Sequence, residues 1–299
     1  PMREKNTPFQ CGTVGFLSKG SERSLSAILL ILAAMTAPTL YSDEKKPVEL
    51  IAHRGYSAVA PENTVAAFHL AWEKGADACE LDLYLSGDGR VVVIHDASTL
   101  RTAGVDLKVA STSTADLQSL DAGSWKSPAY VNERIPTLAQ ALETMPGDRG
   151  RFFLEIKCGP EVVPALKAVL DPMRERAGQL AVISFNLAAA AETKKMLPWV
   201  PVYLLASGKS KGVTRNLDAL IATAREAGLD GLDLGTDWPW TEEMVGRVRQ
   251  AGLGLYVWTV NDPVLARKLA ALGVDGLTTD DPVALRTALQ DGVIPSAGN

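Results

Sequence analysis

Two apolar runs of this sequence each carry carboxylates inside a segment that has the character of a buried strand. The run ACELDLYL places Glu80 and Asp82 two positions apart, and the run RFFLEIK places Glu155 and Lys157 at the same spacing. Successive side chains of a strand point to opposite faces, so both members of each pair share one face. Oxygen-only ligands suit a hard divalent ion such as Mg²⁺ or Ca²⁺ better than Zn²⁺. The alternative is a buried layer of ion pairs in which Arg54 and Lys157 neutralise the acids.

The histidines favour the catalytic interpretation. The chain has three of them. His53 follows the apolar run at residues 48–52 and His95 ends the run VVVIHD, so both are placed where strands end, and histidine is the usual acid or base at neutral pH. His69 falls inside a helical pattern, where we expect a surface or packing role. Trp258 ends the run in YVWTVN, where it would be either core or the apolar wall of a pocket.

The elements that must position these residues alternate regularly along the chain. Short apolar runs predict strands at Val48–Ala52, Ala78–Tyr84, Arg151–Ile156, Leu180–Ser184, Val202–Leu205, Gly231–Leu234, Leu255–Trp258 and Val274–Leu277. Amphipathic stretches predict helices at Asn63–Lys74, Thr137–Thr144, Pro160–Ala177, Leu187–Leu197, Arg215–Ala227, Thr241–Gln250, Asp262–Leu272 and Pro282–Gln290. Such alternation predicts right-handed crossovers and a parallel sheet, and eight units in about 250 residues fit an α/β fold of the closed (β/α)8 TIM barrel type. An open doubly wound sheet is the alternative, although the Gly-rich phosphate loop that normally follows its first strand is absent.

A small insertion after strand two interrupts this rhythm. The turn SGDGR and the run VVVIHD predict a hairpin with the preceding strand. The insertion then occupies about residues 97–135. A long loop after a barrel strand lies on the carboxyl-terminal face, where barrel enzymes keep their active sites.

The bulk composition is that of a globular protein with a large core. The chain has 299 residues, 46% of them hydrophobic and 22% charged, with a formal net charge of −5. This acidic balance and the absence of a long basic run argue against nucleic acid as a partner.

The N-terminal segment, residues 1–45, differs from the rest and is predicted to lie outside the fold. Its apolar run SLSAILLILAAMTAP is too short to span a bilayer comfortably and has the character of a secretory signal. We therefore expect an exported protein, periplasmic or extracellular, whose mature chain has no stable membrane span. The alternative is an extra helix on a cytoplasmic protein. The barrel is then expected at residues 46–292, with a tail at residues 293–299.

A family resemblance emerges from the motifs taken in order. HRG…PENT, ELDL, VVVIHD…LRTAG, LDAGSW, IPTL, LEIK, VWTVN and DGLTTDDP resemble the glycerophosphodiester phosphodiesterase family over about residues 50–288. The resemblance implies a TIM barrel with a small insertion after strand two. It also implies metal-dependent hydrolysis of a glycerophosphodiester to sn-glycerol 3-phosphate and an alcohol, so the expected partner is a small-molecule substrate.

The same resemblance implies a role for each candidate site residue. It assigns Glu80, Asp82 and Glu155 to one divalent metal ion, Mg²⁺ or Ca²⁺; His53 as base and His95 as acid; Arg54 and Lys157 to the phosphate; Glu62 to the metal or a substrate hydroxyl; and Trp258 to the substrate pocket. YLSGDG and RTAG depart mildly from the family pattern, beside the site.

Two other functions stay open at this point. A lysophospholipase D or a phosphatidylinositol-type phosphodiesterase would need an apolar rim, for which the candidates are Leu85, Trp125, Tyr130, Trp238 and Trp240. An exported phosphodiester-binding protein without activity is the other, and the two histidines beside three acids argue against it.

No disulfide is expected within the barrel. If Glu80 and Glu155 are level on neighbouring strands, Cys79 and Cys158 differ by about 13 Å along them, at roughly 3.3 Å per residue. A disulfide needs Cα atoms within about 7 Å.

Overall fold

The computed structural model describes residues 47–210 and 212–291. The chain divides into two units, residues 1–44 and 45–299, and every described residue belongs to the second. The predicted export signal and the tail at residues 293–299 lie outside the described residues.

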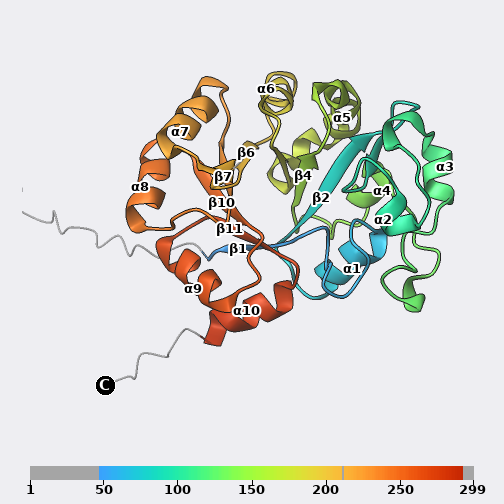
Figure 1. Ribbon diagram of the computed structural model, residues 1–299, viewed down its shortest axis with the longest axis horizontal. Helices are drawn as coiled ribbons and strands as arrows, with labels where there is room; N and C mark the ends of the chain where they lie inside the picture. Colours follow the sequence, from blue (N-terminus) through green and yellow to red (C-terminus); the bar gives the residue numbers. More distant parts are fainter. Residues whose placement is uncertain (1–46, 211, 292–299) are drawn as a thin grey trace, which may run out of the picture. The chain divides into compact units, whose positions relative to one another are not determined.

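A closed barrel of eight parallel strands forms the centre of the described unit (Figure 1). The strands are β1 (Glu49–Ala52), β2 (Ala78–Leu85), β4 (Phe152–Ile156), β5 (Leu180–Ser184), β6 (Val202–Ala206), β9 (Gly231–Gly235), β10 (Gly254–Trp258) and β11 (Gly276–Thr279). Their order is β1-β11-β10-β9-β6-β5-β4-β2, and pairing of β1 with β2 closes the ring. The predicted TIM barrel is therefore confirmed.

One helix follows each barrel strand. These helices are α1 (Val65–Glu73), α4 (Leu138–Leu142), α5 (Val163–Leu170), α6 (Leu187–Met196), α7 (Leu217–Glu226), α8 (Glu242–Gln250), α9 (Pro263–Leu272) and α10 (Pro282–Asp291). Several begin at a side chain that accepts a hydrogen bond from the first turn, as Thr64, Asn186 and Asp262 do. Residues 160–177, predicted as one helix, form three pieces, because Pro164 and Pro172 each restart the backbone in a first helical turn.

The alternation along each strand separates two cores. On β2, Cys79, Leu81 and Leu83 pack outward among the helices. On β4, Phe152 also faces outward, and the rings of Phe68 and Trp72 meet it edge-on, with centroids 5.3 and 5.4 Å away. The outward residues therefore anchor the helices, and the intervening positions are left to fill the barrel.

Aromatic side chains fill the lower part of the barrel interior. Phe153, Tyr203 and Tyr256 pack on one another, with ring centroids 4.9 to 6.3 Å apart. The Arg151 guanidinium lies 4.6 Å from the centre of the Phe153 ring and pairs with Glu49. This packed layer closes the amino-terminal end, so polar groups gather at the carboxyl-terminal end.

The register of β2 against β4 corrects one expectation. Asp82, not Glu80, is level with Glu155, because Cys79 pairs with Phe152. Cys158 is therefore six residues beyond the level of Cys79, roughly 20 Å along the strand direction. Both thiols are free. The two cysteines are therefore unpaired, as expected. The expectation that Glu80 is level with Glu155 was wrong by two residues.

Strand β11 ends two residues later than predicted, at Thr279 rather than Leu277. Thr278 and Thr279 are polar but buried in the sheet, so the apolar pattern stops before the strand does. The residue that emerges at the rim is consequently Asp280.

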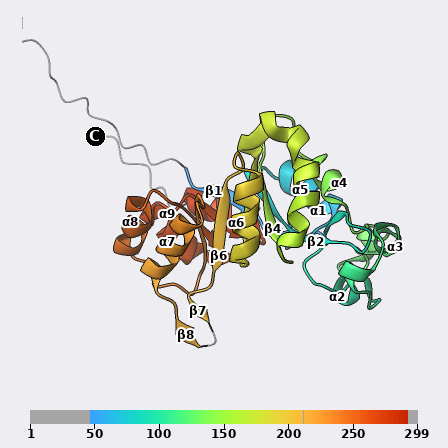
Figure 2. The ribbon, with the colours of Figure 1, turned by 90° about the horizontal axis from the view of Figure 1, so that it is seen from above.

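The insertion contains more regular structure than its sequence indicates. The predicted hairpin is present as β2 with β3 (Val91–Val93). It continues into α2 (Leu100–Ala103) and α3 (Thr114–Ser119), which lie together beside β2 in both views (Figures 1 and 2). A second, unpredicted hairpin, β7 (Lys209–Ser210) with β8 (Val213–Thr214), extends away from β6 in Figure 2.

Candidate active site

Three carboxylates meet inside the carboxyl-terminal end of the barrel. Glu80 and Asp82 come from β2 and Glu155 from β4, and one oxygen of each lies within 4.8 Å of the others. Their exposed fractions are 2%, 0% and 8%. The strand register explains the meeting, since Asp82 is directly opposite Glu155 and Glu80 is one pleat below on the same face.

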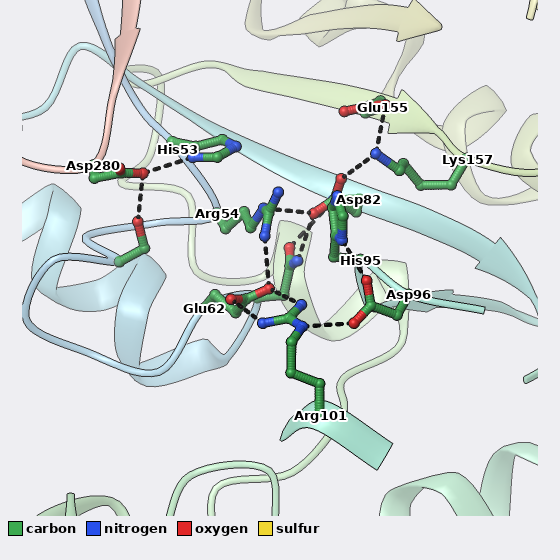
Figure 3. Close-up of polar contacts among 12 residues, drawn as sticks. His53, Arg54, Glu62, Asp82, His95, Asp96, Arg101, Glu155, Lys157 and Asp280 are labelled. Carbon is green, nitrogen blue, oxygen red and sulfur yellow. Dashed lines mark hydrogen bonds and ion pairs between the residues drawn. The ribbon is translucent and has the colours of Figure 1, made fainter. Parts of the chain in front are cut away.

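Two cations flank this acidic group (Figure 3). Arg54 Nε lies 3.2 Å from Asp82 Oδ2, and the Arg54 backbone N–H donates to Glu80 Oε2 at 2.9 Å. Lys157 Nζ lies 2.8 Å from Glu155 Oε1 and 3.5 Å from Asp82 Oδ1. Asp82 therefore pairs with both cations, whereas the contacts of Glu80 are the Arg54 backbone amide and, at 3.9 Å, the His53 imidazole.

The pKa values show that these cations do not balance all three acids. Arg54 and Lys157 hold the pKa of Asp82 below its usual range, although burial acts the other way. Burial raises the pKa of Glu80 well above its usual range, and it raises that of Glu155 to about 7. The neighbouring carboxylates add to both shifts. The two cations therefore do not offset the burial of Glu80 and Glu155, although Lys157 pairs with Glu155.

The donor set fits a hard divalent cation. Within the described residues, Glu80 Oε1 and Asp82 Oδ1 are buried oxygens that accept no hydrogen bond. Buried carboxylate oxygens without donors are costly unless a cation meets them. Three such acids supply the all-oxygen coordination that Mg²⁺ and Ca²⁺ use. Glu80, Asp82 and Glu155 are therefore the residues that would hold the ion.

His53 is oriented by an aspartate that the sequence reasoning missed. Its Nδ1 lies 2.6 Å from Asp280 Oδ1, and its Nε2 lies 3.9 Å from Glu80 Oε2. Strand β11 pairs with β1 up to Thr279, so His53 and Asp280 leave the barrel side by side. The hydrogen bond from His53 lowers the pKa of Asp280 to about 2 against the effect of burial. An ionised carboxylate only accepts, so Nδ1 carries the proton and Nε2 faces the acidic group.

His95 has a matching partner next to it in the chain. Its Nδ1 lies 2.6 Å from Asp96 Oδ1. Burial lowers the pKa of His95, and the nearby charges of Arg54 and Lys157 lower it further, against the effect of Asp82. The ring is therefore neutral at pH 7 in this structure. In both histidines Nδ1 contacts an aspartate, which leaves Nε2 as the nitrogen free to exchange a proton.

The loop from β1 to α1 is folded tightly around the site. Arg54 and Asn63 both adopt positive φ, at 55° and 60°. Gly55 has φ 77°, and a Cβ there would come within 2.7 Å of the Ala67 backbone, so only glycine fits. Asn63 Nδ2 donates to Asp82 Oδ2 at 2.7 Å, and its Oδ1 accepts from the Asp82 backbone. The asparagine of PENT thus fixes a metal-ligand candidate.

Glu62 is held by two arginines. Arg54 Nη1 donates to it at 2.9 Å, and Arg101 donates two hydrogen bonds, at 2.7 and 2.8 Å. These arginines lower the pKa of Glu62, although burial opposes them. Glu62 is not among the carboxylates whose ligand atoms cluster. In this geometry it binds cationic side chains.

An aromatic pair borders the site at the end of β10. Trp258 is half-buried and donates from Nε1 to the Asp233 carbonyl at 3.1 Å. The Phe185 ring meets it edge-on at 5.3 Å and is itself 47% exposed. Trp258 therefore ends the strand half-buried, packed both on Phe185 and on the aromatic core inside the barrel, and its contact with a substrate stays a prediction.

The predicted apolar rim is only partly present. Trp238 and Trp240 are 5% and 3% exposed and belong to the helix-side core, so the expectation that they line a rim was wrong. The run DWPW follows shortly after strand β9, a position from which side chains at the rim of a barrel usually come. Trp125 is 42% exposed, and Leu85 and Tyr130 are half-buried.

Two other titratable residues are outside the acidic group. His69 is exposed on α1 and lines a hollow of about 700 Å³ whose lining includes none of the three clustered acids, in keeping with the non-catalytic role expected for it. Asp233, on β9, is 1% exposed, and burial and Glu155 raise its pKa well above the usual range. The sequence reasoning did not single it out.

Comparison with known proteins gives one consistent result. Residues 53–284 match the model of the glycerophosphoryl diester phosphodiesterase family. The chain is 35% identical to the Bacillus subtilis protein YhdW over 240 residues, covering 78% of this chain and 94% of YhdW. It is 34% identical to the glycerophosphodiester phosphodiesterase of Caldanaerobacter subterraneus subsp. tengcongensis over 248 residues. This match covers 81% of this chain and 98% of that enzyme.

Among solved structures, the chain is similar to an Oleispira antarctica phosphodiesterase in complex with the product sn-glycerol-3-phosphate. The TM-score is 0.71 and the identity 32%, over 82% of this chain and 97% of that one. Among residues 47–210 and 212–291, no helix combines the length and apolar character that crossing a bilayer requires.

We predict that binding of Mg²⁺ releases protons and weakens as the pH falls through about 7. Glu80 and Glu155 have raised pKa values, so they must lose protons before they can coordinate a cation. Isothermal titration calorimetry at pH 7 in buffers of different ionisation enthalpy measures this release. A His69→Ala variant, which removes the exposed histidine of α1, should bind Mg²⁺ as the parent does. Heats independent of the buffer would contradict the prediction.

Proposed function

The chain belongs to the glycerophosphoryl diester phosphodiesterase family, and we propose that it hydrolyses glycerophosphodiesters to sn-glycerol 3-phosphate and an alcohol by metal-dependent, two-histidine catalysis. It is a phosphoric diester hydrolase by that membership. The observation that carries the mechanism is the meeting of three buried carboxylates with two histidines, each bonded through Nδ1 to an aspartate. The solved relative that contains sn-glycerol-3-phosphate supports the substrate class.

The phosphoryl group would bind above the acidic group, between the two cations. Arg54 and Lys157 are 18% and 16% exposed, so each reaches the rim from a mostly buried stem. A phosphodiester transition state spreads negative charge over its oxygens, and fixed cations stabilise that charge where it develops. One Mg²⁺ or Ca²⁺ held by Glu80, Asp82 and Glu155 would supply further Lewis-acid stabilisation.

His53 and His95 would share the two proton transfers. One imidazole accepts the proton of the attacking hydroxyl, and the other donates a proton to the departing alkoxide. The lowered pKa of His95 favours it as the group that begins neutral and accepts the proton. His53, hydrogen-bonded to the anionic Asp280, is then the group placed to donate. This order is the reverse of the one that the resemblance implied.

The lipid-headgroup alternative has less support from the rim. Two of the five side chains expected to form an apolar rim, Trp238 and Trp240, are core residues. An inactive binding protein would need no matched histidine–aspartate pairs. We therefore propose the soluble glycerophosphodiester as the substrate.

We predict that Glu80→Gln and His53→Ala each lower kcat/KM for glycerophosphocholine by about 10²- to 10⁴-fold while the protein stays folded, because the first removes a ligand of the proposed cation and the second a proton-transfer group. His69→Ala, which removes the exposed histidine of α1, is the matched control and should keep parental activity. Alcohol release is measured with chelator and with Mg²⁺ or Ca²⁺ added back. Full activity of either first variant would reject the mechanism, and preference for lysophosphatidylcholine would reject the substrate class.

The pH dependence separates the two histidines. A general base must be neutral, so activity is lost as the pH falls through its pKa, and we expect this acid limb of kcat/KM below 6.5, the ordinary histidine value. Asp96→Asn removes an anion beside His95 and should move the acid limb to still lower pH. Asp280→Asn should leave the acid limb in place. If Asp280→Asn moved the acid limb, His53 would be the base.

A further inference from the structure

The insertion supplies one side chain to the centre of the site network. Arg101, on the one-turn helix α2, lies between Glu62 and Asp96 (Figure 3). Its Nη1 and Nη2 donate to the two oxygens of Glu62 at 2.7 and 2.8 Å, and its Nε donates to Asp96 Oδ2 at 2.6 Å. A single guanidinium thus joins two acids from different segments of the chain.

Each of these two acids contacts a residue with a proposed role in the reaction. Asp96 uses its other oxygen, Oδ1, to contact His95 Nδ1, and Glu62 contacts Arg54 Nη1 at 2.9 Å. Arg101 is therefore one residue removed from both a proton-transfer group and a phosphate-binding cation. Within the described residues, the hydrogen bonds of its guanidinium go to these two acids, so its effect must pass through them.

Asp96 needs this restraint because it is partly open to water. Its side chain is 34% exposed, compared with 11% for Glu62. An isolated surface carboxylate exchanges partners with water, and an exposed ion pair alone contributes little stability. Arg101 occupies Oδ2, which leaves Oδ1 directed at the imidazole. The carboxylate is consequently fixed at both oxygens.

The loop that carries Arg101 is itself fixed. Thr99 Oγ1 donates to the Val105 carbonyl at 2.5 Å and accepts from the Leu107 backbone N–H at 3.2 Å, and the Thr99 N–H donates to the Leu107 carbonyl. Gly104 ends α2 with φ 69°, a conformation that glycine adopts without strain. The guanidinium is thereby presented from a closed turn.

We propose that Arg101 is a positioning residue that holds His95 in its Nδ1–H tautomer through Asp96 and holds Glu62 on Arg54. The role rests on the proposed hydrolysis, in which Nε2 of His95 exchanges the proton. It assigns the insertion a part in the reaction and gives Glu62 an arginine-binding role in place of a metal-binding one. The planar guanidinium of Arg101 is required, because its three N–H donors point in fixed directions at two carboxylates. A lysine ammonium cannot reproduce these directions.

The imidazole nitrogens report the tautomer without turnover. The chain has three histidines, so ¹⁵N-histidine NMR at about pH 8, above the ordinary imidazole pKa, should resolve each ring. We expect the parental enzyme to show His95 as the Nδ1–H form. Arg101→Ala should convert a substantial fraction to the Nε2–H form, and His53, bonded to Asp280, should not change. An unchanged His95 spectrum would overturn the proposal.

Kinetics give the second measurement. Arg101→Ala should lower kcat about 10- to 100-fold, the usual cost of removing a partner of a functional group, with KM changed less than about threefold. Arg101→Lys should recover less than half of the lost rate. Arg134→Ala, which removes another exposed arginine of the insertion, is the matched control for folding of this segment. A large rise in KM with unchanged kcat would make Arg101 a substrate ligand and overturn the positioning role.

The two proposals fail in distinguishable ways. Full activity of a His95→Gln enzyme would reject two-histidine hydrolysis. The ¹⁵N-histidine spectrum of Arg101→Ala would still decide whether Arg101 holds the tautomer of His95. An unchanged spectrum in Arg101→Ala with an inactive His95→Gln enzyme would reject only the role of Arg101.

Discussion

Three carboxylates buried in one barrel mouth repel one another, and the surrounding structure is arranged around that repulsion. Asp82 is matched by Arg54 and Lys157, whereas Glu80 and Glu155 keep raised pKa values because burial and their neighbours disfavour charge. Replacing the group with apolar side chains would remove the electrostatic cost. A bound cation would offset that cost and at the same time make the acids useful, which accounts for their presence in an enzyme of this family.

The segments around the acids supply the residues that hold the acids and the histidines in fixed positions. The HRG…PENT loop brings Arg54 and Asn63 to Asp82 by adopting left-handed backbone at both residues. Strand β11 closes the barrel beside β1 and supplies Asp280 to His53. The insertion supplies Arg101 to Asp96 and Glu62. Each catalytic candidate is thus oriented by a residue from a different element.

Much of this architecture could be predicted from the sequence, since strand ends and the period-two pattern locate Glu80, Asp82, Glu155, His53 and His95 without tertiary information. The orienting residues could not be found this way. Asp280 was hidden because Thr278 and Thr279 extend β11 beyond its apolar pattern. Register was missed by two residues because it depends on barrel closure, which no local pattern encodes. The tryptophans of DWPW were misplaced for a similar reason, as burial by neighbouring helices is a tertiary property.

The central claim is that Glu80, Asp82 and Glu155 form a centre for one divalent cation. Mn²⁺ accepts the same oxygen ligands as Mg²⁺, so crystals grown with Mn²⁺ and measured at the manganese absorption edge test it directly. The account predicts one anomalous peak within bonding distance of all three carboxylates. Full occupancy at another position, or no bound ion at saturating Mn²⁺, would contradict the account.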